Sequence, residues 1–207
     1  MNNLIGEMPS GSAAEVVARL RPLAASGDSK AAALLFLKLD ECRRAHLRRE
    51  QLSKETFDEG GGPCAGLSRE EITSGAGWLD KAAAAGLVEA QLIYAANSEP
   101  FIGREDDVLR NPERVIEYKR KAMRYLVQAA GNGSVEALQS LASAYRYGLL
   151  VQRDPTQAYA YVYAANRAIP SREAEQSARQ YRSELTPQQS QQGARRGEEI
   201  YQACCRQ

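Results

Sequence analysis

The chain has 207 residues, a formal net charge of +1 and hydrophobic residues at 43% of its positions. So small a net charge gives no overall field that would draw in nucleic acid or an anionic membrane. No run of 18 apolar residues occurs, so no segment is predicted to span a bilayer as a helix. Few residues are aromatic and no alternating stretch is long enough for a sheet, which favours an all-α fold.

The N-terminal part predicts two helices and then a polar insertion. Residues 1–11 are predicted to be disordered, and they lack the basic head and apolar core of a signal peptide. The capping box from Ser12 to Glu15 opens a first helix, and a second helix is predicted from residue 28 to about residue 44. A charged stretch follows and is broken by glycines and proline at 60–63.

The middle of the chain predicts three further helices. Residues 68–71 form another capping box, which opens a helix with an apolar inner face. A short helix is predicted at 88–97, and residues 98–111 form a loop. Asn111 and Pro112 then begin a long helix that runs to about residue 131.

Residues 133–168 carry the clearest helix-turn-helix pattern. Gly148 is predicted to stop the first helix, while Asp154 caps the second helix and Pro155 occupies its first position. Apolar residues at helical spacing line both helices: Ala137, Leu141, Ala142, Tyr145, Ala158, Tyr161, Ala164 and Ala165. Gly86 and Ala90 align with Gly133 and Ala137, which indicates an internal repeat with units at about 27–86, 87–133 and 134–168.

Residues 133–168 resemble a Sel1-like repeat, a relative of the tetratricopeptide repeat. Ala142, Leu150 and Ala168 replace glycines of that pattern, and Tyr161 replaces its tryptophan. The resemblance implies a right-handed α/α solenoid of about nine helices, forming a single domain over residues 12–207. Helices within 171–205 would then cap the end of the stack.

The four cysteines bear on the compartment. Cys42 and Cys64 bracket the insertion, and a disulfide between them would close a loop of about 22 residues, worth about 3 kcal/mol in the chain-entropy model. Two unrelated buried thiols are the alternative. A zinc site is disfavoured, because only His46 could join the cysteines. The pairing of Cys204 and Cys205 stays open, since a bridge between neighbours would be strained.

An oxidised Cys42–Cys64 pair in a bacterial chain of the resembled family implies the periplasm. The leader would then be absent from the given chain, and the cytoplasm is the alternative.

No catalytic constellation is visible. His46 stands among arginines, where a solvated residue at a helix end is the favoured interpretation. No phosphate-binding loop occurs, and carboxylates such as Glu117 have basic neighbours such as Lys121. We therefore predict no enzyme, no cofactor and no metal.

Two basic clusters and a set of tyrosines remain. The clusters lie at 43–49 and 114–124. Acidic residues are interleaved with the basic ones, and aromatic residues are not placed to stack on bases. A solvated face or a protein-docking patch is therefore favoured over a nucleic-acid-binding site. In the resembled family the first helix of each unit lines the concave face, and with the exposed tyrosines this gives candidate protein-binding residues: Lys38, Gln91, Tyr94, Gln139, Arg146 and Tyr147.

We therefore expect a monomeric, non-catalytic scaffold or adaptor of the bacterial cell envelope that binds a protein partner through its concave face and inserted loops. An immunity protein that neutralises a secreted toxin is an alternative. A hydrolase of cell-wall-related compounds is the alternative from another class, and it predicts a cleft with a polarised Ser, Asp or Glu.

Overall fold

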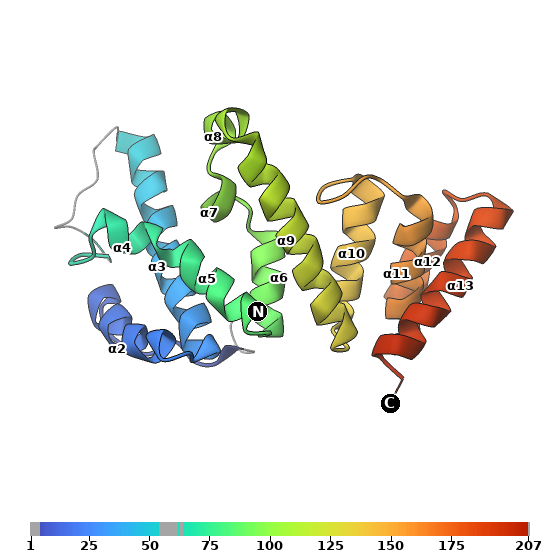
Figure 1. The fold of residues 1–207 in the computed structure, drawn as a ribbon, viewed down its shortest axis with the longest axis horizontal. Helices are drawn as coiled ribbons and strands as arrows, with labels where there is room; N and C mark the ends of the chain where they lie inside the picture. The colour runs from blue at the N-terminus through green and yellow to red at the C-terminus, as the bar shows by residue number, and fades with distance from the viewer. Residues whose placement is uncertain (1–4, 54–61, 63, 207) are drawn as a thin grey trace. The chain divides into compact units, whose positions relative to one another are not determined.

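The fold is all-α (Figure 1). The structure, a computed structural model, describes residues 5–53, 62 and 64–206, and no strand occurs among them. Most of the predicted glycine-rich break and residues 1–4 of the predicted disordered tail lie outside the described residues. Ile5 is buried, contrary to a disordered segment over all of residues 1–11, because burying so large an apolar side chain is favourable.

The chain divides into two compact units, Met1–Asp107 and Val108–Gln207, where the sequence predicted one domain over residues 12–207. The division falls within α8, in the second predicted repeat unit. Each unit has its own set of buried apolar side chains. The units are therefore described separately.

Unit 1 holds the helices α2 to α7 and the start of α8. Their bounds are α2 Ala13–Ala25, α3 Ser29–Ser53, α4 Arg69–Thr73, α5 Gly75–Ala84, α6 Val88–Ala96, α7 Glu99–Ile102 and α8 Glu105–Arg110. Successive long helices pack side by side: α2 against α3, α3 against α5, and α5 against α6. Phe36, Leu39 and Leu79 are fully buried between them.

Unit 1 differs from the prediction in three places. Helix α3 continues to Ser53, past the predicted end near residue 44, because the residues that follow Cys42 are mostly good helix formers. The predicted helix after Ser68 is split at Ser74, and this split adds one helix to the expected number. There the hydroxyls of Thr73 and Ser74 donate hydrogen bonds to backbone carbonyls of α4. Such side-chain bonds compete with the backbone hydrogen bonds that would continue a helix. Helices α7 and α8 occupy the predicted loop 98–111.

Unit 2 is a sequence of neighbouring helices. These are α9 Pro112–Gly131, α10 Val135–Tyr147, α11 Pro155–Ala168, α12 Arg172–Arg182 and α13 Pro187–Cys204. Helix α10 packs on α9 and on α11, while α12 and α13 both pack on α11. No helix in the described part of the chain is long and apolar enough to cross a membrane.

The predicted local signals of the α10–α11 pair are confirmed. Gly148 ends α10 in the left-handed conformation with φ of 68°, which glycine adopts without steric cost. The Asp154 carboxylate accepts from the backbone N–H groups of Thr156 and Gln157, each at 3.0 Å, at the start of α11. The rings of Tyr145 and Tyr161 stack across the two helices at 5.7 Å between centroids. The signature residues therefore hold the hairpin together.

Candidate protein-interaction surface

Two of the six candidate protein-binding residues are buried, which corrects the prediction for them. Gln91 is 1% exposed, and its side-chain amide donates to the Ala83 carbonyl at 3.1 Å. Tyr94 is 3% exposed, and its ring lies 4.1 Å from that of Phe101, centroid to centroid. Helix α6 is short, and every residue from Ala90 to Tyr94 is buried. Because α5 packs on it and α7 brings Phe101 onto Tyr94, α6 offers no binding face at these positions.

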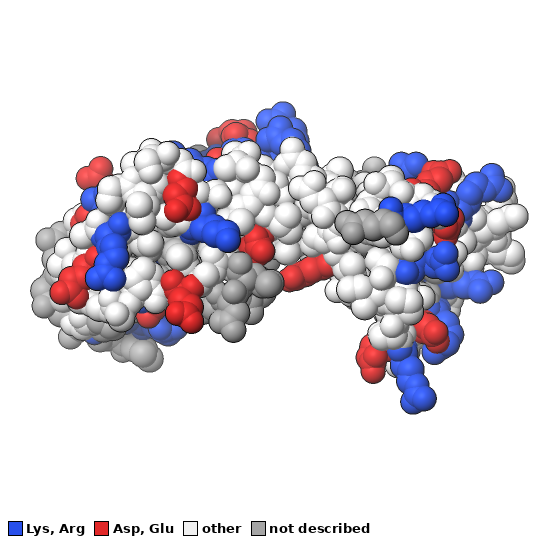
Figure 2. All heavy atoms as spheres, turned by 90° about the horizontal axis from the view of Figure 1, so that it is seen from below, with Lys and Arg blue, Asp and Glu red and all other residues white. Residues whose placement is uncertain are grey.

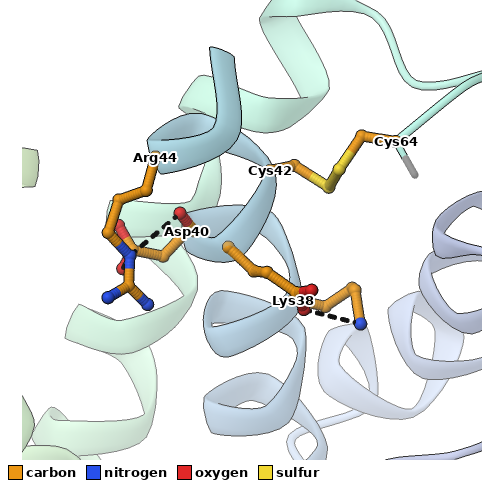
Figure 3. The surroundings of a disulfide bond; sticks show 6 residues. Lys38, Asp40, Cys42, Arg44 and Cys64 are labelled. Atoms are coloured by element: carbon orange, nitrogen blue, oxygen red, sulfur yellow. Dashed lines mark hydrogen bonds and ion pairs between the residues drawn. A yellow bond between two sulfur atoms is a disulfide. The ribbon is translucent and has the colours of Figure 1, made fainter. Parts of the chain in front are cut away.

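Lys38, on α3, is paired with another residue of the same helix. Its ammonium forms an ion pair with Glu41 at 2.7 Å, one turn further along the helix (Figure 3). Nearby, the buried Asp40 accepts from Arg43 at 2.8 Å and from Arg44 at 3.0 Å. These charged side chains of α3 are therefore paired with one another.

The three remaining candidates lie on α10. Gln139 and Arg146 are seven residues apart, so they share one face of the helix, and Tyr147 follows at its C-terminal end. Gln139 is exposed, the Arg146 side chain is 14% exposed, and Tyr147 is 63% exposed. Of the predicted residues, Arg146 and Tyr147 therefore come together at the end of α10.

Arg146 is the centre of a charged and aromatic group that we call the Arg146 cluster: Arg146, Tyr147, Arg153, Tyr181 and Glu184. The Arg146 guanidinium lies 4.4 Å from the centroid of the Tyr181 ring and 5.5 Å from that of Tyr147. It pairs with one oxygen of Glu184, whose other oxygen lies 3.5 Å from Arg153. Arg153 also donates to the Arg146 carbonyl at 3.0 Å. The cluster thus fixes the end of α12 to the end of α10.

The electrostatics of the cluster keep Arg146 charged. Partial burial alone would lower the pKa of Arg146, but its hydrogen bonds to Tyr181 and Glu184 and the Glu184 charge outweigh burial and raise that pKa. Beside it, Tyr147 and Leu149 are both more than half exposed, and the Arg153 side chain is 60% exposed. Exposed tyrosine and arginine next to a rigid support are the side chains that carry most of the energy in protein interfaces.

Unit 1 has a pocket of about 220 Å³ between α3, the α4–α5 junction and α7–α8. Phe36 and Ile72 give it apolar walls, and Asp40, Arg43 and Glu99 give it polar ones. Arg43 bridges the two carboxylates, at 2.8 Å from Asp40 and 3.2 Å from Glu99. These lining carboxylates are therefore paired with arginine, which does not favour either as a polarised catalytic acid.

The cysteines form two disulfides. Cys42 is joined to Cys64, with the Cα atoms 5.7 Å apart and both residues buried (Figure 3). Cys42 lies inside α3 instead of at its predicted end. Cys204 is joined to its neighbour Cys205 at the end of α13, a pairing that the sequence left open. Because Cys42 and Cys64 are bonded to each other, Cys204 and Cys205 are the two cysteines that remain to pair.

His46 lies partly buried on α3. In the described part of the chain no three His, Cys, Asp or Glu side chains are grouped to hold a metal ion. The structure thus gathers contact side chains at the end of α10.

No family model matches the chain, and no curated protein matches it. Among solved structures it is similar to a protective antigen of uropathogenic Escherichia coli that displays an SLR fold. The identity is 19% and the TM-score is 0.42, and the likeness covers 93% of this chain. The match takes in only 42% of the antigen's chain, so this chain spans less than half of that length.

Proposed function

We propose that the protein is a non-catalytic interaction module that binds a protein partner through the Arg146 cluster. The supporting observation is the exposed Tyr147 and Arg153 beside an arginine held by two tyrosine rings and a carboxylate. Such a surface offers rigid aromatic and guanidinium contacts at low entropic cost, because the cluster is already ordered before a partner arrives.

We further propose an oxidising compartment, in particular the periplasm, as the place of action. All cysteines of the described chain are in disulfides, and structural disulfides persist in oxidising compartments. An adaptor and an immunity protein share this surface chemistry. A toxin encoded beside this gene would favour the immunity role.

The test compares partner capture by the full chain and by Tyr147→Ala, using an envelope extract of the source organism and mass spectrometry. We expect a protein that the wild type retains and that Tyr147→Ala retains at least about tenfold less, in the range of an interface hot spot. The matched control is Ile169→Ala, which truncates a side chain of similar exposure at the far end of the α10–α11 hairpin. The control should retain the same protein as the wild type.

A partner held equally by all three proteins would assign binding to another surface. Turnover of purified cell-wall fragments by the wild type, with no protein retained, would replace the proposal by the hydrolase alternative.

A further inference from the structure

The charge of the chain is divided between its units. Unit 2 has fifteen Lys and Arg against nine Asp and Glu, a formal net charge of +6, whereas unit 1 has twelve against seventeen, a net charge of −5. In Figure 2, Lys and Arg side chains gather over the C-terminal helices at the right-hand end of the view. The net charge of +1 therefore conceals a strongly basic half, which attracts anionic partners.

Helix α9 carries part of this charge on a face that also exposes apolar side chains. On its opposite face, residues such as Tyr118, Ala122 and Leu126 are buried. On the outer face Ile116 is 67% exposed and Val127 is 51% exposed. A single exposed apolar residue is ordinary, but these two lie on one line of the helix.

That line is defined by its spacing. Ile116, Arg120, Met123 and Val127 follow one another at four, three and four residues, the spacing of the contact positions of a coiled coil. We call these four residues the α9 seam. At 1.5 Å per residue the seam is about 16 Å long, enough for about three turns of a partner helix.

Two exposed arginines lie on this face of α9. Arg120 in the seam and Arg124 beside it are exposed, and neither makes a hydrogen bond or an ion pair with any residue that the structure describes. A partner that covers the seam must desolvate Arg120, and that cost is offset only where a carboxylate meets the guanidinium. Exposed Glu113 and Glu117 also lie on this side of α9, nearer its start. Charge complementarity therefore places the carboxylates of an occupant opposite Arg120 and Arg124, nearer the end of the helix.

We propose that the α9 seam is a docking surface for an acidic amphipathic helix of a partner protein. Apolar side chains of that helix pack on Ile116, Met123 and Val127, and its carboxylates pair with Arg120 and Arg124. The proposal shares with the proposed function only the class of ligand, a protein. Its surface is a different one, so each can fail without the other.

The probe is a synthetic helical peptide of about three heptads with Leu at the a and d positions and Glu at e and g, where like charges oppose self-pairing. A twin peptide carries Lys at e and g. Binding of each labelled peptide to the full chain is measured by fluorescence anisotropy at about 50 mM and about 300 mM salt. We expect the Glu peptide to bind, to bind more weakly at the higher salt, and the Lys peptide not to bind.

Variants locate the site. Ile116→Ser/Val127→Ser should weaken binding of the Glu peptide about tenfold or more, because both side chains lose apolar contact. Arg120→Gln/Arg124→Gln should weaken binding at low salt and flatten the salt dependence. The matched control Ile169→Ser should leave affinity within about twofold, since it alters an exposed apolar residue away from the seam. Tyr147→Ala should also leave it unchanged.

Several results would overturn the proposal. These are failure of the Glu peptide to bind, equal binding of the Lys peptide, and affinity that the seam variant does not alter. Sedimentation that shows a dimer of the wild type and a monomer of Ile116→Ser/Val127→Ser would assign the seam to a second copy. Flotation of the wild type but not of that variant with phosphatidylglycerol vesicles would assign it to a membrane surface.

Discussion

Arg146 shows how unit 2 holds a charged side chain in place at its surface. The guanidinium is mostly covered, which would cost free energy if its donors were left unpaired. The Tyr181 ring and the Glu184 carboxylate are the partners of this charge. Arg153 differs because it keeps most of its side chain in solvent, so it is free to change partners when another protein binds.

Tyr118 gives a prediction for alkaline pH. Burial raises its pKa to about 12 in the folded protein, against about 10 for an unperturbed tyrosine. Between these values the unfolded chain has lost the phenol proton while the folded chain keeps it, so the free energy of unfolding falls as pH rises. Below about pH 10 both states are protonated and this contribution is fully present.

We expect the Tyr118→Phe variant to lose less unfolding free energy than the wild type between about pH 9 and about pH 11. Tyr159 and Tyr161, whose pKa values burial also raises, keep part of the dependence in both proteins. Urea unfolding at the two pH values measures the difference within each protein, so any pH-independent loss from the substitution cancels. Equal decreases in wild type and variant would contradict the burial effect at Tyr118.

Helix α13 depends on two glycines for its place against α11. A Cβ atom on Gly197 would lie 2.7 Å from the Ala160 carbonyl oxygen and 2.7 Å from the Tyr163 ring. A Cβ on Gly193 would lie 2.8 Å from the Tyr159 ring. The small residues of α13 therefore allow the two helices to approach more closely than any larger side chain would.

Gly197→Ala should consequently destabilise the protein, although alanine is the better helix former. Overpacking against a backbone oxygen costs about 1–3 kcal/mol, and the gain in helix propensity returns at most about 1 kcal/mol. Gly77→Ala in α5 is the matched control, because its Cβ would meet nothing within 4 Å, and we expect it to be neutral or stabilising. Denaturant unfolding of the two variants gives the signs. A stabilised Gly197→Ala would show that α13 can move away at no cost.

At the scale of elements, signals that act within one turn were predictable and long-range packing was not. The capping boxes at Ser12 and Ser68 lie where the sequence placed them, because a cap depends on residues three positions apart. The burial of Gln91 and Tyr94 depends on α5 and α7, which no local pattern reports. The four-residue spacing of Gly193 and Gly197 is a sequence signal for a close helix contact that the sequence analysis missed.

At the scale of the molecule, the net charge of the whole chain does not show that unit 1 is acidic and unit 2 is basic. Counted over 207 residues, the chain is nearly neutral, and no sequence pattern indicates a division at Asp107. Only the packing of the helices into two units shows over which residues the charges should be summed. The position of the end of α10 was predictable, because Gly148 is a local stop signal for that helix.

Two compact units with separate cores should respond separately to local damage. Cys42→Ala/Cys64→Ala opens a loop in unit 1 and should cost about 3 kcal/mol by the chain-entropy model, since the bridge restricts the unfolded chain. Hydrogen exchange by mass spectrometry should then increase in α2, α3 and α5 and stay unchanged in α10–α13. Gly197→Ala should give the reverse, with faster exchange in α11 and α13 alone. Faster exchange throughout the chain in both variants would mean that the two units unfold as one.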